Sequence, residues 1–157
     1  MSLPDDIRAR LKELWPHARL VPRRAARHLP AGPGSYVLVF SLPEPLTFAS
    51  GRFRGRTVPA GWYAYAGSAR GPGGLRGRVS RHMKKRKKRR WHIDWLTCAR
   101  EEIFALGFAQ ESECHLAGAL RQAGHASPLP GFGSSDCKDC ESHLVFLAPL
   151  SAAAGQS

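Results

Sequence analysis

Residues 61–82, GWYAYAGSARGPGGLRGRVSRH, hold a predicted strand, a loop and a helix in direct succession. Residues 62–66 are aromatic or small and contain no helix breaker, so we predict a strand that ends at Gly67. Residues 67–74 carry four glycines and a proline, which is typical of a loop. The chain that follows has helical periodicity.

The predicted helix that begins at Leu75 carries ionisable groups on its apolar face. One helical face presents, in order, Leu75, Arg78, Val79, His82 and Met83. An arginine is almost never fully buried without a partner. We therefore expect Arg78 to meet an anion, either a carboxylate of this protein or a phosphate.

The strongest strand signal is at residues 34–42, GSYVLVFSL. This stretch is nearly all apolar and is bounded by a glycine and a proline, which favours a strand buried on both faces in the middle of a sheet. We expect it to pair antiparallel with the strand that contains Tyr65. We predict further strands at residues 102–108 and 144–147, and an edge piece at residues 46–48.

Two more helices are predicted from periodicity and capping signals. Residues 5–15 form an amphipathic pattern that Pro16 would stop. Residues 111–123 form another, with Ser112 as a possible cap, and its inward stripe includes Glu113. Residues 22–33 are basic and proline-rich, and we expect them to be irregular.

The charge of the chain is its most unusual global property. It has 24 Lys and Arg residues against 12 Asp and Glu residues, a net charge of +12 and a pI near 10.5. This balance indicates a polyanionic partner, with nucleic acid first and an anionic membrane second. Residues 84–90 are all Lys or Arg and are expected to contact phosphate. The candidate nucleic-acid contacts are Arg76, Arg81, Lys84, Lys85, Arg86, Lys87, Lys88, Arg89 and Arg90.

Several observations bear on the compartment. No apolar run approaches the roughly 18 residues of a membrane span, so we expect no membrane insertion. The first 15 residues are polar and carry Asp5 and Asp6, unlike a secretory signal. Four cysteines are too few for a disulfide scaffold in 157 residues. We therefore expect a reducing, cytoplasmic location.

Five side chains would form a reactive set if the fold brought them together. The set contains an acid, a permanent cation, an imidazole and two phenols, namely Glu113, Arg78, His82, Tyr36 and Tyr65. A lone carboxylate with water and a phosphate oxygen suits Mg²⁺ or Mn²⁺. An arginine fork can offset the charge that grows on a phosphate during hydrolysis. The set therefore points to phosphodiester hydrolysis.

The same residues carry a family resemblance. Gly34-Ser35-Tyr36 is followed by Tyr65-Ala66-Gly67, then by Arg78 and His82 four residues apart, and later by Glu113. In this order and separation they resemble the motifs of the GIY-YIG nuclease superfamily. The segments WHIDWL at residues 91–96 and GFGSSDCKDCESHL at residues 131–144 are similar to an uncharacterised branch of it, a domain of unknown function.

The resemblance implies a fold and a reaction. The fold is a small α/β domain of the α+β type, with a central three-stranded antiparallel sheet flanked by helices. The reaction is hydrolysis of DNA by an endonuclease with one divalent metal ion, Mg²⁺ or Mn²⁺. By resemblance Tyr36 is the candidate for activating water, Tyr65 is the second motif tyrosine, Arg78 stabilises the phosphate, His82 is the supporting histidine and Glu113 is the metal ligand.

The resemblance also suggests how the chain is divided. We expect a lead-in of one helix and a basic segment at residues 1–33, the nuclease-like domain at residues 34–150, and a disordered tail at residues 151–157. Ser35 and Ala66 stand where the motif name has isoleucines. These positions should pack on the opposite face of each strand, so the chemistry would be retained.

Two alternatives remain open from the sequence. The first is a non-catalytic module that binds DNA or RNA through the same basic surface. The second is a zinc-stabilised interaction domain, because Cys137, Cys140 and His143 have zinc-ligand types at a plausible spacing. Those three would need a fourth ligand from Cys114 or His115. Otherwise they are a pair of free thiols and a core or pocket histidine.

Overall fold

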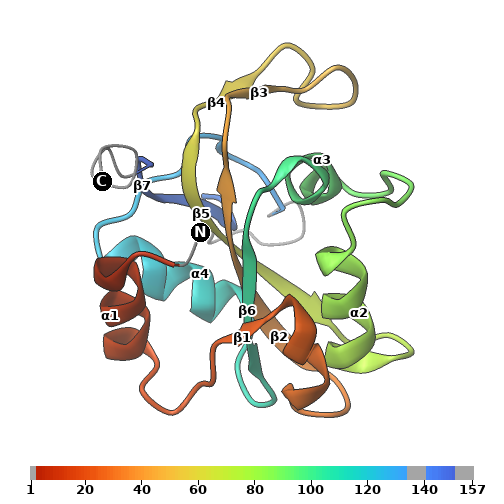
Figure 1. Cartoon of the computed structure of the whole chain (residues 1–157), viewed down its shortest axis with the longest axis vertical. Coiled ribbons are helices and arrows are strands. Elements are labelled where there is room, and N and C mark those ends of the chain that lie inside the picture. Colours follow the sequence, from red (N-terminus) through yellow and green to blue (C-terminus); the bar gives the residue numbers. More distant parts are fainter. Residues whose placement is uncertain (1–2, 134–140, 151–157) are drawn as a thin grey trace.

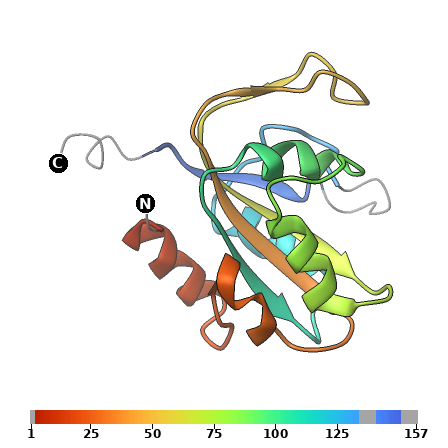
Figure 2. The same ribbon diagram turned by 45° about the vertical axis from the view of Figure 1, so that its right-hand side comes forward.

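The computed structural model describes residues 3–133 and 141–150, and within these ranges the chain forms a mixed α/β domain (Figures 1 and 2). One sheet has five strands in the order β1-β6-β2-β5-β7, and all neighbours are antiparallel. A separate two-stranded sheet pairs β3 with β4. The elements are, in chain order, α1 (Asp5–Leu14), β1 (Val21–Pro22), the 3₁₀ helix η1 (Arg23–His28), β2 (Gly34–Leu42), β3 (Leu46–Thr47), β4 (Thr57–Val58), β5 (Gly61–Ala69), α2 (Gly74–Met83), α3 (His92–Ala99), β6 (Ile103–Phe108), α4 (Glu113–Gln122) and β7 (Leu144–Ala148).

Helices cover both faces of the five-stranded sheet. In Figure 1, α1 and α4 lie on the left and α2 and α3 lie on the right. Alternation along β2 divides its side chains between two cores. Tyr36, Leu38 and Phe40 belong to the core beneath α2 and α3, whereas Val37 and Val39 belong to the core beneath α1 and α4. Every residue of β2 is buried, as the continuous apolar run predicted.

The antiparallel pairing of β2 with β5 is confirmed, and it aligns the two motif tyrosines. Tyr36 is opposite Gly67, and Leu38 is opposite Tyr65. Both tyrosines belong to the face that α2 covers. Ala66, by contrast, packs in the core beneath α1 and α4, which confirms that it is a packing position on the opposite face.

The number of strands and two boundaries differ from the sequence prediction. The sheet has five strands instead of three, because the short strands β1 and β7 extend its two edges. The predicted end of β5 at Gly67 is wrong, since Gly34 and Ser35 supply backbone partners as far as Ala69. The predicted irregular segment 22–33 is also partly wrong, because it contains the end of β1 and all of η1.

The edge position explains how a proline enters strand β1. Val21 is fully buried and lies opposite Ala105, so an apolar anchor holds this segment against β6. Pro22 has no N–H to donate, which an edge strand tolerates. A strand of two residues is too short to show the alternation of apolar and polar side chains by which strands are predicted from sequence.

The predicted helices and the remaining main-sheet strands are confirmed. Helix α4 is capped by Ser112, whose hydroxyl accepts a hydrogen bond from the backbone N–H of His115, and Gly124 follows it with a positive φ of 99°. Residues 46–48 form only the short strand β3, without Phe48. The predicted tail at residues 151–157 lies outside the described residues. Within the described ranges no helix is long and apolar enough to cross a membrane.

Candidate active site

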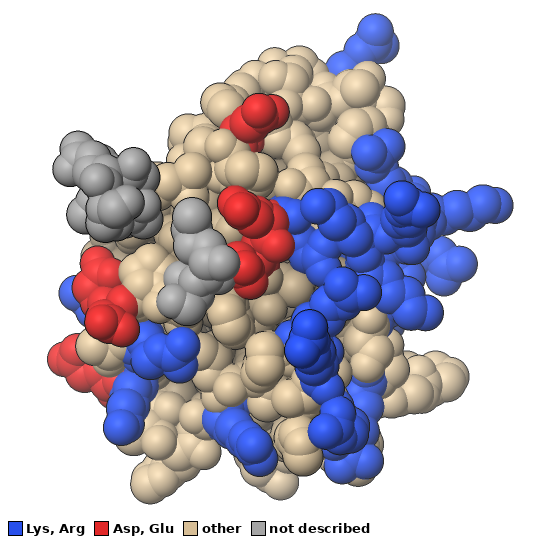
Figure 3. All heavy atoms as spheres, in the orientation of Figure 1, with Lys and Arg blue, Asp and Glu red and all other residues tan. Residues whose placement is uncertain are grey.

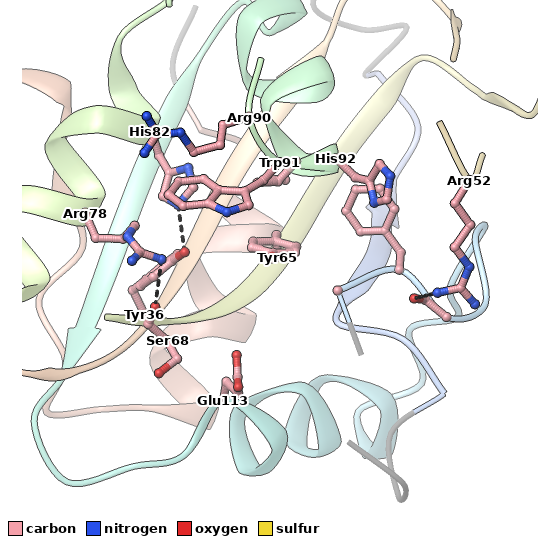
Figure 4. A pocket seen from close by; sticks show the side chains of 14 residues that line it. Tyr36, Arg52, Tyr65, Ser68, Arg78, His82, Arg90, Trp91, His92 and Glu113 are labelled. Atoms are coloured by element: carbon pink, nitrogen blue, oxygen red, sulfur yellow. Dashed lines mark hydrogen bonds between the residues drawn. The ribbon is translucent and has the colours of Figure 1, made fainter. Parts of the chain in front are cut away.

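All five side chains that the sequence singled out line one cavity of about 480 Å³ (Figure 4). They come from four elements: Tyr36 from β2, Tyr65 from β5, Arg78 and His82 from α2, and Glu113 from the first turn of α4. The cavity therefore joins residues that are up to 77 positions apart in the sequence, counting from 36 to 113. The remaining lining residues are Arg52, Ser68, Arg90, Trp91, His92, Ile93, Gly131, Phe132 and Gly133.

The closest polar contact in the cavity joins Tyr36 to His82. The phenol oxygen of Tyr36 lies 2.7 Å from Nε2 of His82, and both side chains are buried. Burial, followed by the neighbouring Tyr65, raises the pKa of Tyr36 well above its ordinary value, while the charge of Arg78 opposes the rise. At neutral pH Tyr36 therefore keeps its proton, and its hydroxyl donates a hydrogen bond to Nε2 when the ring of His82 carries its own proton on Nδ1.

Gly67 allows this contact to form. Its Cα lies beneath the ring of Tyr36, because the two residues are opposite each other in the β2–β5 pair. A Cβ at position 67 would overlap the ring and the hydroxyl of Tyr36. The backbone of Gly67 is extended and does not require glycine for its φ. The glycine is thus needed for space, and it fixes where the phenol can lie.

His82 is neutral in the folded chain. Burial, and then the positive charge of Lys87, lowers the pKa of His82 to about 3. Nε2 accepts from Tyr36 in the tautomer that carries the ring proton on Nδ1. That atom is buried and makes no hydrogen bond within the described residues, and it lies 4.0 Å from Oδ1 of Asp94. A proton that reached Nε2 would create a cation beside this carboxylate.

Asp94 organises the connection between α2 and α3. Its fully buried carboxylate accepts two hydrogen bonds of 3.0 Å from Arg81, and one each from the backbone N–H groups of Arg90 (2.7 Å) and Trp91 (2.9 Å). Burial alone would raise the pKa of Asp94, but these donors hold it below its ordinary value. Asp94 thus holds the end of the cationic segment beside His82.

Arg78 lies at the cavity wall, where it contacts a carbonyl oxygen and an aromatic ring. Its guanidinium donates to the carbonyl oxygen of Ser68 at 3.3 Å and lies 4.5 Å from the ring centre of Trp91. A carbonyl and an aromatic ring orient a guanidinium without neutralising it. The side chain is only partly buried, and Figure 4 shows it beside the phenol of Tyr36. It is therefore placed to bind an anion that enters the cavity.

Glu113 approaches the same space from the opposite layer of the fold. Figure 4 shows its carboxylate pointing from the start of α4 toward the cavity. Behind it, Nδ1 of His143 lies 3.8 Å from Oε2 of Glu113, and Nε2 of His143 lies 3.7 Å from Sγ of Cys114. Burial, and then the charge of Glu113, raises the pKa of Tyr65. The carboxylate and both phenols therefore share one electrostatic environment.

Comparison with known proteins adds a family to this geometry. The family model described as "Domain of unknown function DUF123" matches residues 35–155. The chain belongs to the DUF123 family. No curated protein and no solved structure matches it. The DUF123 match includes all five cavity residues and begins within β2, after α1, β1 and η1.

The basic surface of this DUF123 domain adjoins the cavity. Figure 3 shows Lys and Arg side chains gathered on the side that carries α2, α3 and their connection. Six of the seven cations at residues 84–90 are exposed, and Arg89 lies 4.3 Å from the ring centre of Trp95. The predicted contact segment is therefore accessible to a polyanion, and Arg90 reaches the cavity itself.

Three of the candidate nucleic-acid contacts have internal partners. Arg81 is paired with Asp94, and Arg76 donates to the carbonyl oxygen of Leu29 at 2.9 Å. Lys87 donates to the carbonyls of Arg81 (3.1 Å) and His82 (2.6 Å) at the end of α2, and burial lowers its pKa to about 8. We assign Arg81 and Lys87, which are partly buried, a structural role and retain Arg76 and the other exposed cations as the candidate DNA contacts.

Several cavity residues were not assigned to the site from the sequence. Three of them, Trp91, His92 and Phe132, lie in the two segments that resemble the uncharacterised branch of the superfamily. That resemblance marks the segments but implies no catalytic or binding role for these residues. Arg52 carries no such signal, because it lies in a loop with two other arginines. Its place in the cavity depends on how the loop between β3 and β4 packs on α3 and on Phe132.

Two of the three residues in the predicted zinc site, Cys137 and Cys140, lie outside the described residues. His143, its third member, is buried beside Glu113 and Cys114. Among the residues that are described, no group of three or more His, Cys, Asp or Glu side chains has an arrangement that holds a metal ion. Glu113 is thus the carboxylate to test as a metal ligand.

Proposed function

We propose that this DUF123 domain is a divalent-metal-dependent endonuclease that hydrolyses phosphodiester bonds of DNA, with a catalytic set like that of the GIY-YIG superfamily. The observation that carries the proposal is the meeting of Tyr36, Tyr65, Arg78, His82 and Glu113 in one cavity. Within that set a neutral imidazole is already hydrogen-bonded to a buried phenol. Structural side chains seldom combine an acid, a base and an unneutralised cation in one accessible space.

The donor set in the cavity fits Mg²⁺ or Mn²⁺ better than zinc. Glu113 offers a partly buried carboxylate, and hard cations of this kind bind through one or two carboxylates while water and phosphate oxygens complete the shell. Zinc would require several nitrogen or sulfur ligands. When bound, the ion would polarise the phosphate and acidify a water molecule. Glu113 is the residue that would hold it.

Tyr36 and His82 provide a route for the proton of the attacking water. The phenol oxygen accepts a proton from water as its own proton passes to Nε2 of His82. The water oxygen forms a bond to phosphorus, the bond from phosphorus to the leaving oxygen breaks, and that oxygen takes up a proton from solvent. The resulting imidazolium lies beside Asp94, whose charge favours it, whereas burial and the charge of Lys87 oppose it, so His82 holds the proton only briefly. His82 later releases the proton to solvent.

Arg78 and Tyr65 complete the chemistry of the cavity. The guanidinium of Arg78 donates to phosphate oxygens and offsets the negative charge that grows on them in the transition state. It also favours the phenolate form of Tyr36 during transfer of the proton. Tyr65 packs edge-on against Phe132, with ring centres 5.9 Å apart, so its hydroxyl is held in the cavity wall. The exposed cations beside the cavity bind the DNA backbone.

Cleavage of labelled DNA tests the proposal. Single-stranded, duplex, flapped and branched substrates are incubated with Mg²⁺ or Mn²⁺ and the parent protein, Glu113→Gln or Arg78→Ala. We expect loss of about 100-fold or more of the rate in each variant, because a metal ligand or a transition-state donor is removed. The matched control is Glu111→Gln, which alters a carboxylate that pairs with His115 at 2.6 Å, outside the cavity.

The outcome separates the proposal from its alternative. Metal-dependent cleavage that Glu111→Gln retains and Glu113→Gln loses supports the enzyme. Equal cleavage by Glu113→Gln and the parent, or cleavage that persists with a chelator, would overturn it. Salt-sensitive DNA binding with no cleavage of any substrate would establish the non-catalytic module instead.

A further inference from the structure

The cavity extends well beyond the five catalytic candidates. Arg52 and His92 form its far end, on the side away from Arg78 in Figure 4, and residues 131–133 adjoin them. A volume of about 480 Å³ lies within the range of roughly 300–1,000 Å³ that is usual for pockets that bind organic ligands. A hydrated metal ion and one phosphate group would fill only part of it. A second ligand group therefore has room at the far end.

Aromatic packing fixes the loop that supplies Arg52. Phe53, the next residue, is 4% exposed and packs on Phe132 with ring centres 5.2 Å apart. Phe48 packs on both Phe53 and Trp95, at 5.9 and 6.0 Å. The backbone of the loop is closed by hydrogen bonds between Phe48 and Arg56 and between Phe48 and Gly55. The backbone position of Arg52 is thus set by the loop, and its exposed side chain lines the cavity.

The guanidinium of Arg52 is oriented in the same way as that of Arg78. It donates to the carbonyl oxygen of Gly131 at 3.4 Å and lies 5.4 Å from the ring centre of Phe53. Gly131 has a positive φ of 83°, and a Cβ there would come within 2.7 Å of the guanidinium. A guanidinium has five N–H donors. The contact to Gly131 occupies one of them, so the group can still bind an oxyanion.

His92 is the second polar group at this end. Its ring contacts Phe53 edge-on at 4.9 Å and Phe132 at 6.2 Å. Gly51, with φ of 82°, lies against it, and a Cβ there would come within 3.3 Å of its Nε2. Burial, and then the charge of Arg52, lowers the pKa of His92. At neutral pH this imidazole is an uncharged donor beside the cation of Arg52.

We propose that Arg52 and His92 form a second phosphate subsite at the far end of the cavity. It binds a phosphodiester that neighbours the scissile one on the same strand. Arg52 supplies the charge and a fork of donors, and the ring of His92 supplies one neutral N–H. Two cations at opposite ends of one cavity align the strand across Tyr65, which lies between them in Figure 4, and across Phe132, which packs edge-on against Tyr65. This inference rests on the proposed function, since it names how the substrate strand is held.

The salt dependence of DNA binding tests the subsite. Affinities of fluorescein-labelled single-stranded and duplex DNA of one sequence are measured by anisotropy between about 50 and 200 mM salt. The protein is the full chain with Glu113→Gln, which prevents cleavage. Adding Arg52→Gln should weaken binding and reduce the log–log salt slope by about 0.7 for the single strand or about 0.9 for the duplex, the value for one phosphate.

Matched variants make the result decisive. Arg54→Gln removes the same charge from an exposed residue of the same loop that does not line the cavity, and it should leave the slope near that of the parent. Arg52→Lys should keep the slope, because the charge remains. A slope that falls equally in Arg52→Gln and Arg54→Gln, or in neither, would overturn the subsite. Because binding is measured, absence of cleavage would count against the proposed function alone.

Discussion

Replacement of Gly67 by alanine should displace the phenol on which the proposed chemistry depends. The new Cβ would overlap the ring and hydroxyl of Tyr36, which is 2% exposed and enclosed by the β2–β5 pair. The ring must move, and its hydrogen bond of 2.7 Å to His82 is then lost. Forcing an extra methyl group into a packed core costs about 1–3 kcal/mol. Leaving a buried imidazole acceptor without its donor costs about 1–3 kcal/mol more.

We therefore expect Gly67→Ala to lower the free energy of unfolding by about 2–6 kcal/mol. Equilibrium unfolding in urea, followed by circular dichroism, measures this change directly. The matched control is Gly77→Ala in α2, where no heavy atom lies within 4 Å of the added Cβ. This control should stabilise the protein by about 1 kcal/mol, because alanine is the better helix former. A Gly67→Ala protein within about 0.5 kcal/mol of the parent would refute the reasoning.

Two further predictions concern the groups behind Tyr36. Because the pKa of His82 is about 3 in the folded chain and near 6.5 in the unfolded chain, stability should be lost as the pH falls below about 6.5, by up to about 1.4 kcal/mol per pH unit. His82→Gln should flatten this profile in urea unfolding, and parallel profiles for variant and parent would contradict the assignment. Asp94→Asn should lower the free energy of unfolding by about 3–5 kcal/mol, because it breaks a buried pair with Arg81. A loss below about 1 kcal/mol would show that the carboxylate does not hold the α2–α3 connection.

Most of the fold follows from patterns that the sequence displays locally. The apolar run of β2 predicted a buried central strand, and the mixed face of α2 predicted that His82 and Arg78 point inward. Glu113 was found in the same way, from its place on the inward stripe of α4. Each of these predictions depends on the spacing of apolar residues within a single helix or strand, and that spacing can be read directly from the sequence. The structure shows the five candidates in one cavity, while their chemistry stays a proposal.

The parts that the sequence did not predict depend on contacts between distant segments. Asp94 meets His82 only because Arg81 and two backbone N–H groups fix the α2–α3 connection around its carboxylate. Arg52 reaches the cavity because Phe53 anchors its loop on Phe132, about 80 residues away. The sequence predicts Gly67 as the end of a strand, whereas in the structure its lack of a side chain leaves space for the ring of Tyr36 on the neighbouring strand. None of these relations produces a local pattern.

The central claim is that the hydroxyl of Tyr36 takes part in cleavage, and the most direct test is a substitution that removes this one oxygen atom. Tyr36→Phe keeps the ring but deletes the hydroxyl that binds His82, and Tyr63→Phe is its control, because Tyr63 belongs to the same core and donates instead to the carbonyl of Pro59 at 2.5 Å. Single-turnover cleavage of DNA with Mg²⁺ or Mn²⁺ is measured for both. We predict that Tyr36→Phe loses about 100-fold or more of the rate while its affinity for DNA is retained, and that Tyr63→Phe cleaves like the parent. Equal cleavage rates in both variants would contradict the account.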